Sequence, residues 1–149
     1  MRRRGDHVQL KTIAAIRDLQ RLAAENRAAR AAAALREKES HRDDHERQRQ
    51  SLEDSWTASL SEPSIDMSLS SLWSAALLRQ ETVVRECRRD AETAAADVKR
   101  RASDLHVATM RRDVAKDMAQ SAVKARQRRL EEIALQDVAD RHAQRRRMP

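Results

Sequence analysis

The chain has 149 residues, a formal net charge of +7 and a charged fraction of 37%. It contains two tryptophans, no phenylalanine or tyrosine, one glycine and two prolines. A compact globule needs aromatic bulk in its core and turn residues to reverse the chain several times, so this composition excludes one and favours long helices. Gly5 alone cannot build the glycine-rich loops that cradle nucleotide phosphates, and we expect a protein that is not an enzyme.

Cysteine usage and hydrophobicity indicate the compartment. Cys87 is the only cysteine, so no intrachain disulfide or cysteine-based zinc cluster can form, which fits a reducing environment. The basic stretch from Arg2 to Arg4 is not followed by an unbroken apolar segment, and no segment has the length and apolarity of a membrane span. We expect a cytoplasmic protein with no direct membrane insertion and no cofactor.

Residues from about 7 to 60 contain nothing that interrupts a helix. Apolar residues recur every three or four positions near both ends of this range, which predicts a stripe facing a partner helix. Alanines dominate 28–34, and the run 36–51 has no apolar residue. Asn26 either fixes the register of the stripe or faces water. The predicted stripe consists of Leu10, Ile13, Ile16, Leu19, Leu22 and Ala23, and later of Leu52, Trp56 and Leu60.

Two histidines in the polar run raise the question of a metal site. His41 and His45 stand four residues apart and would share a helix face, so zinc ligation is geometrically conceivable. However, Arg42 stands where the zinc-protease signature has a glutamate, and the run offers no convincing third and fourth ligands. We expect no metal and a solvated helix face. Its acidic residues, Asp43, Asp44 and Glu46, are expected to face Arg85, Arg88 and Arg89 of a second helix.

The strongest break in the helical pattern is a serine-rich stretch around Pro63. Proline disfavours helix at the residue before it, and Ser64, Asp66 or Ser68 can each cap a new helix. The sequence therefore predicts a turn over about 61–67.

A second helix is predicted from 68 to about 146. Steps of alternating four and three residues select mostly apolar positions, which is the pattern of a coiled coil, although abundant alanine leaves the exact register open. These positions are Trp73, Leu77, Gln80, Val84, Cys87, Ala91, Ala94, Val98, Arg101, Leu105, Ala108, Arg112, Ala115, Ala119, Ala122, Arg126, Arg129 and Ile133.

Two helices and one turn predict an all-α fold, a long antiparallel coiled-coil hairpin that forms a single domain over 1–149. Residues whose numbers add up to about 129 should then face each other, which pairs Trp56 with Trp73 and Leu10 with Ala119. The second helix is the longer one. Its residues beyond about Ala122 lack a partner in the first helix and would project by roughly 35 to 40 Å at 1.5 Å per residue.

Two features allow a structural and a functional interpretation. Trp56 and Trp73 flank the turn, where they either lock the hairpin tip or form a docking surface, and we favour the lock. Cys87 lies among arginines that would lower the pKa of a thiol, but its place between Val84 and Ala91 favours a small core residue.

Basic residues gather near both ends of the sequence, which would make one end of the hairpin strongly positive. The cations either aid solubility or steer an acidic partner. Nucleic acid is a less favoured partner because no aromatic residues accompany the arginines and no known binding module is present. The clusters are Arg2 to Arg4, and Lys124, Arg126, Arg128, Arg129, Arg141, Arg145, Arg146 and Arg147.

The run "KARQRRLEEIALQDVADRHAQRRR" and the opening "HVQLKTIAAIRDLQRLAAENRAAR" together resemble the FliJ family of flagellar export proteins and its YscO-type counterparts in virulence type III secretion. The similarity covers nearly the whole chain, from the basic start through one short turn to a longer second helix. This resemblance implies a two-helix antiparallel coiled coil similar to the shaft of rotary ATP synthases.

The same resemblance implies a function and partners. The chain would be a stalk in the centre of a hexameric export ATPase, linking it to an export gate protein at the inner membrane and also associating with export chaperones. The alternatives are a basic coiled-coil protein that binds nucleic acid and a generic coiled-coil adaptor. On this analogy the ATPase contacts are Arg126, Arg129, Ile133, Arg141 and Arg145, with Leu10 and Ile13 at the base of the projecting segment.

Overall fold

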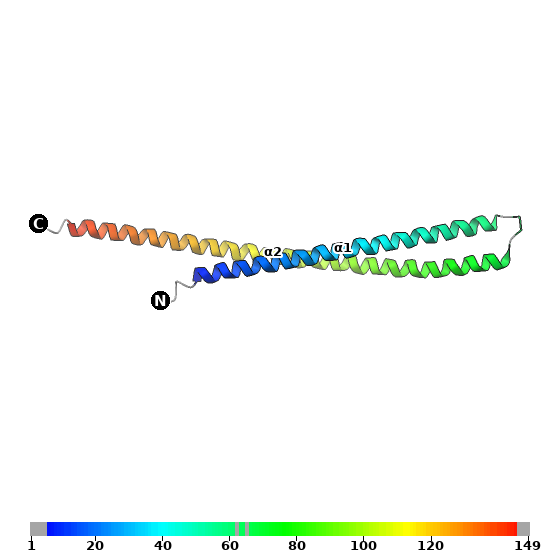
Figure 1. Ribbon diagram of the computed structural model, residues 1–149. Helices are drawn as coiled ribbons and strands as arrows, with labels where there is room; N and C mark the ends of the chain where they lie inside the picture. The colour runs from blue at the N-terminus through cyan, green and yellow to red at the C-terminus, as the bar shows by residue number, and fades with distance from the viewer. Residues whose placement is uncertain (1–5, 62, 65, 146–149) are drawn as a thin grey trace. The chain divides into compact units, whose positions relative to one another are not determined.

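A computed structural model describes the backbone of residues 6–61, 63–64 and 66–145, and the side chains of residues 7–61, 63–64 and 66–142. Helix α1 covers Asp6–Leu60, 55 residues, and helix α2 covers Met67–Arg145, 79 residues. Figure 1 shows the two helices joined by the short connection between them. The predicted all-α hairpin is therefore confirmed, with each helix beginning one residue earlier than expected.

The helix boundaries follow from local chemistry. The backbone N–H of Ser61 bonds to the carbonyl of Ala58 at 3.1 Å, which tightens the last turn of α1 just before Pro63. At the start of α2, Oδ1 of Asp66 accepts hydrogen bonds from the backbone N–H groups of Ser68 at 2.8 Å and Leu69 at 3.3 Å. Of the three predicted caps, Asp66 is thus the one that stabilises the helix start.

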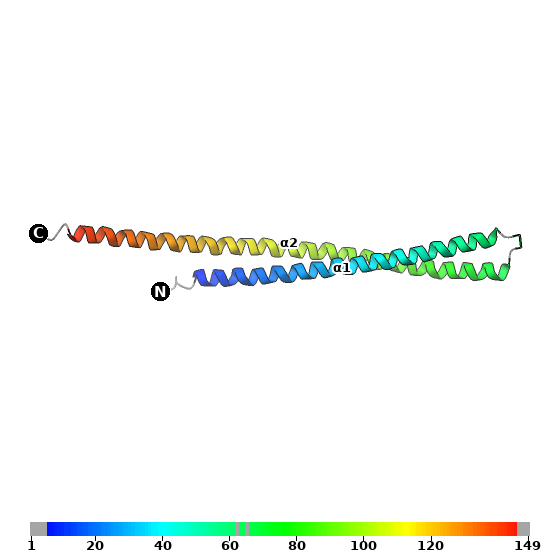
Figure 2. The same ribbon diagram turned by 45° about the horizontal axis from the view of Figure 1, so that its top comes forward.

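The contacts of the chain divide it into two compact units, each made of one stretch of α1 and one of α2. Unit 1 combines Met1–Ala24 with Leu105–Pro149, and unit 2 is Glu25–Asp104. Within each unit the two helical stretches lie side by side in the views of Figures 1 and 2. Unit 2 contains the turn, and unit 1 contains the start of α1 and the end of α2.

The residues through which α1 and α2 pack against each other form a seam, and on α2 this seam follows the predicted register. Every predicted position from Trp73 to Ala122 is buried or half-buried, with Val84 fully buried and Cys87 half-buried beside it. Arg126, Arg129 and Ile133 continue the same spacing, but they are exposed. The seam on α2 therefore ends where α1 begins, as expected for a helix that extends beyond its partner helix.

The α1 side of the seam differs from the prediction in its first turns. From Ile13 to Ala23 the predicted stripe is exposed, with Ile16 at 49% and Leu19 at 67%. Its later members Leu52 and Trp56 are half-buried as predicted, whereas Leu60 is exposed. Asn26 also faces water. Between residues 10 and 35 the buried or half-buried positions are Leu10, Ala14, Arg17, Arg21, Ala24, Ala28, Ala31, Ala32 and Leu35.

The reason for this difference lies in the opposing helix. Residues 8–23 carry more apolar side chains than one narrow seam can hold, and the more hydrophobic of the two stripes there is not the one that faces α2. The buried residues of α2 in unit 1 are the alanines Ala115 and Ala119, and Ala24 is the buried residue of α1. Small side chains on both helices allow close approach, and the bulky aliphatic residues lie beside the seam.

Cross-helix contacts agree with the predicted pairing. In unit 2, Nζ of Lys38 lies 3.0 Å from Oδ2 of Asp90, and the indole N–H of Trp56 donates to Oγ of Ser70 at 3.2 Å. In unit 1, Nη1 of Arg126 lies 2.8 Å from Nε2 of His7. The register is thus confirmed to within about one and a half helical turns.

Candidate interaction surfaces

The histidine run in unit 2 connects the two helices. Nε2 of Gln80 donates to the backbone carbonyl of His45 at 3.0 Å and lies 3.2 Å from His45 Nδ1 and 3.3 Å from Oε1 of Gln48. His41 instead lies near Glu37 of its own helix, with Nε2 3.9 Å from Oε1. The described residues contain no group of three or more His, Cys, Asp or Glu side chains arranged for a metal ion.

The acidic residues of this run pair mostly within α1. Glu46 does reach Arg88 across the seam, at 3.1 Å, as predicted. Asp43 binds Arg42 and Asp44 binds Arg47 on the same helix, whereas Arg85 pairs with Glu81 on α2. Arg42 and Asp43 are adjacent, and the other two pairs are three or four residues apart on one helix, a spacing that brings side chains together without the partner helix.

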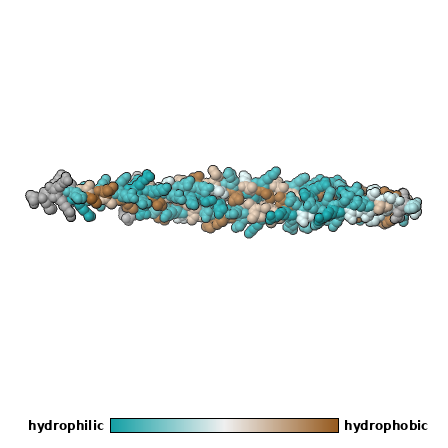
Figure 3. Space-filling model, turned by 90° about the horizontal axis from the view of Figure 1, so that it is seen from above, coloured by the Kyte–Doolittle hydropathy of each residue, from teal (hydrophilic) through white to brown (hydrophobic). Residues whose placement is uncertain are grey.

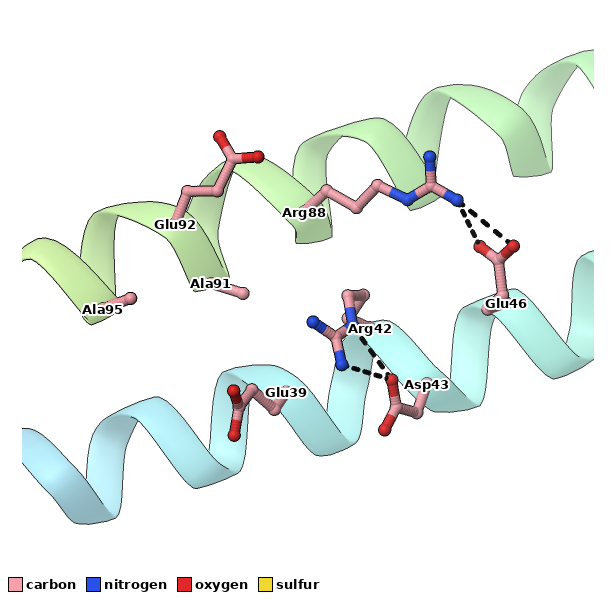
Figure 4. A pocket seen from close by; sticks show the side chains of 8 residues that line it. All are labelled: Glu39, Arg42, Asp43, Glu46, Arg88, Ala91, Glu92 and Ala95. Atoms are coloured by element: carbon pink, nitrogen blue, oxygen red, sulfur yellow. Dashed lines mark hydrogen bonds and ion pairs between the residues drawn. The ribbon is translucent and has the colours of Figure 1, made fainter.

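A shallow pocket of about 520 Å³ lies between the helices in unit 2. Figure 4 shows Glu46 and Arg88 facing each other across it, with Arg42 bonded to Asp43 beside them. The hydrogen bond to Asp43 raises the pKa of Arg42, so this guanidinium stays charged. Arg42 and Arg88 pair with Asp43 and Glu46, Glu39 and Glu92 leave the lining acidic, and the lining presents no nucleophile next to a base. Its lining is Glu39, Arg42, Asp43, Glu46, Arg88, Ala91, Glu92 and Ala95.

The tryptophans of unit 2 lie at its turn end. Both indoles are half-buried, and the N–H of Trp56 bonds to Ser70. The Nε1 of Trp73 is buried and has no hydrogen-bond partner. Burial of both rings favours a structural contribution at the tip, and a role in docking stays untested.

The predicted contact residues near the end of α2 lie on an exposed part of unit 1. Arg129, Ile133 and Arg141 are all exposed, whereas Arg126 also contacts His7. The side chain of Arg145 lies outside those described, as do Arg2 to Arg4, Arg146 and Arg147. We name residues 127–142 of α2 the C-terminal segment. All its side chains are exposed, and α2 continues there past the start of α1 (Figure 1).

An apolar groove in unit 1 was only partly foreseen. It measures about 380 Å³ and includes Leu10 and Ile13, which the resemblance placed at the base of the projecting segment. Its α2 wall is formed by Met110, Val114 and Met118, which sequence reasoning did not single out as a surface. Their four-residue spacing beside the predicted seam was the available signal. Arg17, Arg111 and Ala115 complete the lining.

A second open groove in unit 1 is rimmed by cations. Lys11, Lys116 and Lys124 surround Val123 and Ala119, and Gln120 completes the lining. Among the described side chains, none of these three lysines forms an ion pair. Unit 1 thus combines exposed apolar side chains with unneutralised positive charge, and Figure 3 shows apolar side chains in patches among hydrophilic ones on the surface.

The comparisons with known proteins add no relative. No family model, no curated protein and no solved structure matches the chain. The described helical residues also include no stretch that is long and apolar enough to cross a bilayer.

Proposed function

We propose that the chain is a nonenzymatic helical-hairpin stalk that binds the hexameric ATPase of a type III or flagellar export system and couples it to the export gate. The observation that carries the proposal is the C-terminal segment, a single exposed helix with arginines and aliphatic residues on its surface. The partner itself comes from the resemblance of the two terminal runs to the FliJ family. Export chaperones are further proposed partners on the same ground.

The mechanism would be differential binding. A single helix presents different side chains around its circumference, such as Arg129 on one side and Leu135 on another. In a ring of six identical subunits, each subunit would therefore contact a different set of these side chains. Each subunit conformation is then stabilised to a different extent, which shifts the populations of the subunit states.

The test is the turnover of the purified cognate ATPase with and without this protein. Stimulation is expected from the unchanged chain. Arg129→Glu combined with Arg141→Glu should weaken the apparent affinity of the chain for the ATPase at least about tenfold. Arg79→Glu with Arg89→Glu is the matched control, because it makes the same charge change at exposed positions of unit 2. Equal loss in both pairs, or stimulation that survives the first pair, would contradict the proposed contact.

Binding of nucleic acid is the second candidate, favoured by the unneutralised lysines of unit 1. Such binding would be electrostatic, so its affinity should fall steeply as salt rises. Titration of duplex and single-stranded oligonucleotides at two salt concentrations separates it from the stalk function.

A further inference from the structure

In unit 1 each helix carries two sets of positions that could form a seam. We name the set that packs in the structure the first seam. It contains two leucines, three arginines and otherwise alanines, so little bulky apolar surface is buried there. Its members are Leu10, Ala14, Arg17, Arg21 and Ala24 on α1, and Leu105, Ala108, Arg112, Ala115, Ala119 and Ala122 on α2.

The other set lies one residue earlier in the sequence on both helices, and all its members are exposed. Its steps also alternate between four and three residues, which is the spacing of a coiled-coil seam. It offers two isoleucines, two valines and a methionine, with one arginine in place of three. Its members are Gln9, Ile13, Ile16, Gln20 and Ala23 on α1, and Val107, Arg111, Val114, Met118 and Ser121 on α2.

The exposed sets of the two helices lie on the same side of unit 1. Ile13 of α1 lines the apolar groove together with Val114 and Met118 of α2. One residue corresponds to about 100° around a helix, so a turn of each helix by this angle, in opposite directions, would bring the exposed sets together. The pairing of numbers that add up to about 129 then places Ile16 against Val114 and Ile13 against Met118.

The first seam is an imperfect packing. Nε of Arg112 is buried and makes no hydrogen bond to any described group, although Oδ1 of Asp113 lies 3.1 Å away. A buried donor without a partner costs free energy. Ile13 and Ile16 stay 46% and 49% exposed, and burying them would stabilise the other packing. The alanines of the first seam oppose this gain, because they allow a closer approach of the helices.

We infer that unit 1 exchanges between the first seam and a second seam, in which both helices have turned by one residue position. Coiled coils absorb phase shifts of their apolar pattern by winding the helices locally tighter or looser. Two packings of one sequence that differ little in free energy form a switch, which a partner biases by binding one of them better.

The exchange changes the surface of unit 1. In the second seam Ile13, Val114 and Met118 are buried between the helices, so the apolar groove closes. Arg17 and Arg112 turn outward, where water satisfies the guanidinium groups. The surface thus becomes less apolar and more cationic. This inference uses contacts within unit 1 alone and does not depend on the ATPase partner.

The first test is disulfide trapping in the full chain, in a Cys87→Ser background. Ile16→Cys combined with Val114→Cys should form an intramolecular disulfide under mild oxidation, because the second seam brings these positions together. Lys11→Cys combined with Gln120→Cys is the matched control, since both residues line the lysine-rimmed groove on the other flank of the first seam. The first pair should cross-link at least about tenfold faster than the control pair. Equal rates would overturn the inference.

The second test uses two neighbouring arginines, of which Arg111 belongs to the second seam and Arg112 to the first. Arg111→Leu should stabilise the second seam and speed trapping of the cysteines at positions 16 and 114 about fivefold. Arg112→Leu should stabilise the first seam and slow the same trapping by about as much. Both variants lose one charge at adjacent positions. Trapping that is unchanged, or that changes in the same direction in both variants, would contradict the exchange.

Discussion

Gln80 of α2 donates a hydrogen bond to the backbone carbonyl of His45 on α1, at 3.0 Å, within unit 2. The same amide nitrogen lies near the His45 ring and the Gln48 side chain. A polar residue thus occupies a seam position and is satisfied by the opposite helix. Such a residue specifies register, because a shift by one turn would leave its amide unpaired.

Replacing Gln80 with alanine should therefore destabilise the hairpin. The loss of one cross-helix hydrogen bond is expected to lower the free energy of unfolding by about 0.5 to 1.5 kcal/mol. Urea denaturation followed by circular dichroism measures this change. Gln136→Ala, at an exposed position of the C-terminal segment, is the control and should change stability by no more than helix propensity does.

Val84 is the fully buried side chain of the seam, with 0% exposure. Val84→Ala should cost about 1 to 3 kcal/mol, because it removes two buried methyl groups and leaves a small cavity. Thermal unfolding compares it with Val8→Ala, which deletes the same atoms at an exposed position of α1. A similar loss in both variants would mean that seam packing contributes little at Val84.

Asp66 caps α2 through the N–H groups of Ser68 and Leu69. Asp66→Ala should destabilise the start of α2 by about 0.5 to 2 kcal/mol, and Asp66→Asn, which keeps the acceptor oxygen, should recover most of the loss. Hydrogen exchange of the first amides of α2 provides a local readout. Ser64→Ala should leave this exchange unchanged. Faster exchange in that variant would show that Ser64, and not Asp66 alone, caps the helix.

The contact between Lys38 and Asp90 should make stability depend on alkaline pH. The hydrogen bond to Asp90, with its charge, raises the pKa of Lys38 above its ordinary value. Because the pKa of Lys38 is higher in the folded chain than in the unfolded chain, the pair stabilises the folded state fully below the unfolded-state pKa. This stabilisation is lost as pH rises through the folded-state pKa.

The consequence is measurable as a difference between two proteins. The urea midpoint of the unchanged chain should exceed that of Lys38→Gln by a small margin at neutral pH, since both side chains are exposed. This margin should disappear as pH rises through the raised pKa of Lys38, where the lysine loses its proton. A margin that persists there would show that the pair contributes through packing and not through charge.

Much of the fold could be predicted because one helix carries a long, continuous heptad pattern. From Trp73 to Ala122, α2 offers one continuous set of positions, and the structure buries or half-buries all of them. Pro63 and the serines around it also place the turn within a residue of its observed limits. Local rules sufficed here because spacing and turn chemistry are local properties.

The first turns of α1 could not be assigned in the same way. Ile13, Ile16 and Leu19 form a more hydrophobic stripe than Ala14, Arg17 and Arg21, yet the second set faces α2. The choice depends on the alanines of α2, which lie about a hundred residues away in the sequence. The apolar groove of unit 1 follows from this choice, and so the sequence alone named only its Leu10 and Ile13.

The buried hydrophobic residues among those described are Ala24, Ala31, Val84, Ala91, Ala115 and Ala119. Alanine conceals little apolar surface, so melting should hydrate less hydrocarbon than it does in a globule of equal length. Because the heat-capacity change of unfolding scales with the apolar area exposed, calorimetry should record a value below the roughly 12 to 15 cal/mol/K per residue that is usual for globular domains. The curve of stability against temperature should accordingly be flat, leaving the hairpin similarly stable in the cold and at moderate warmth.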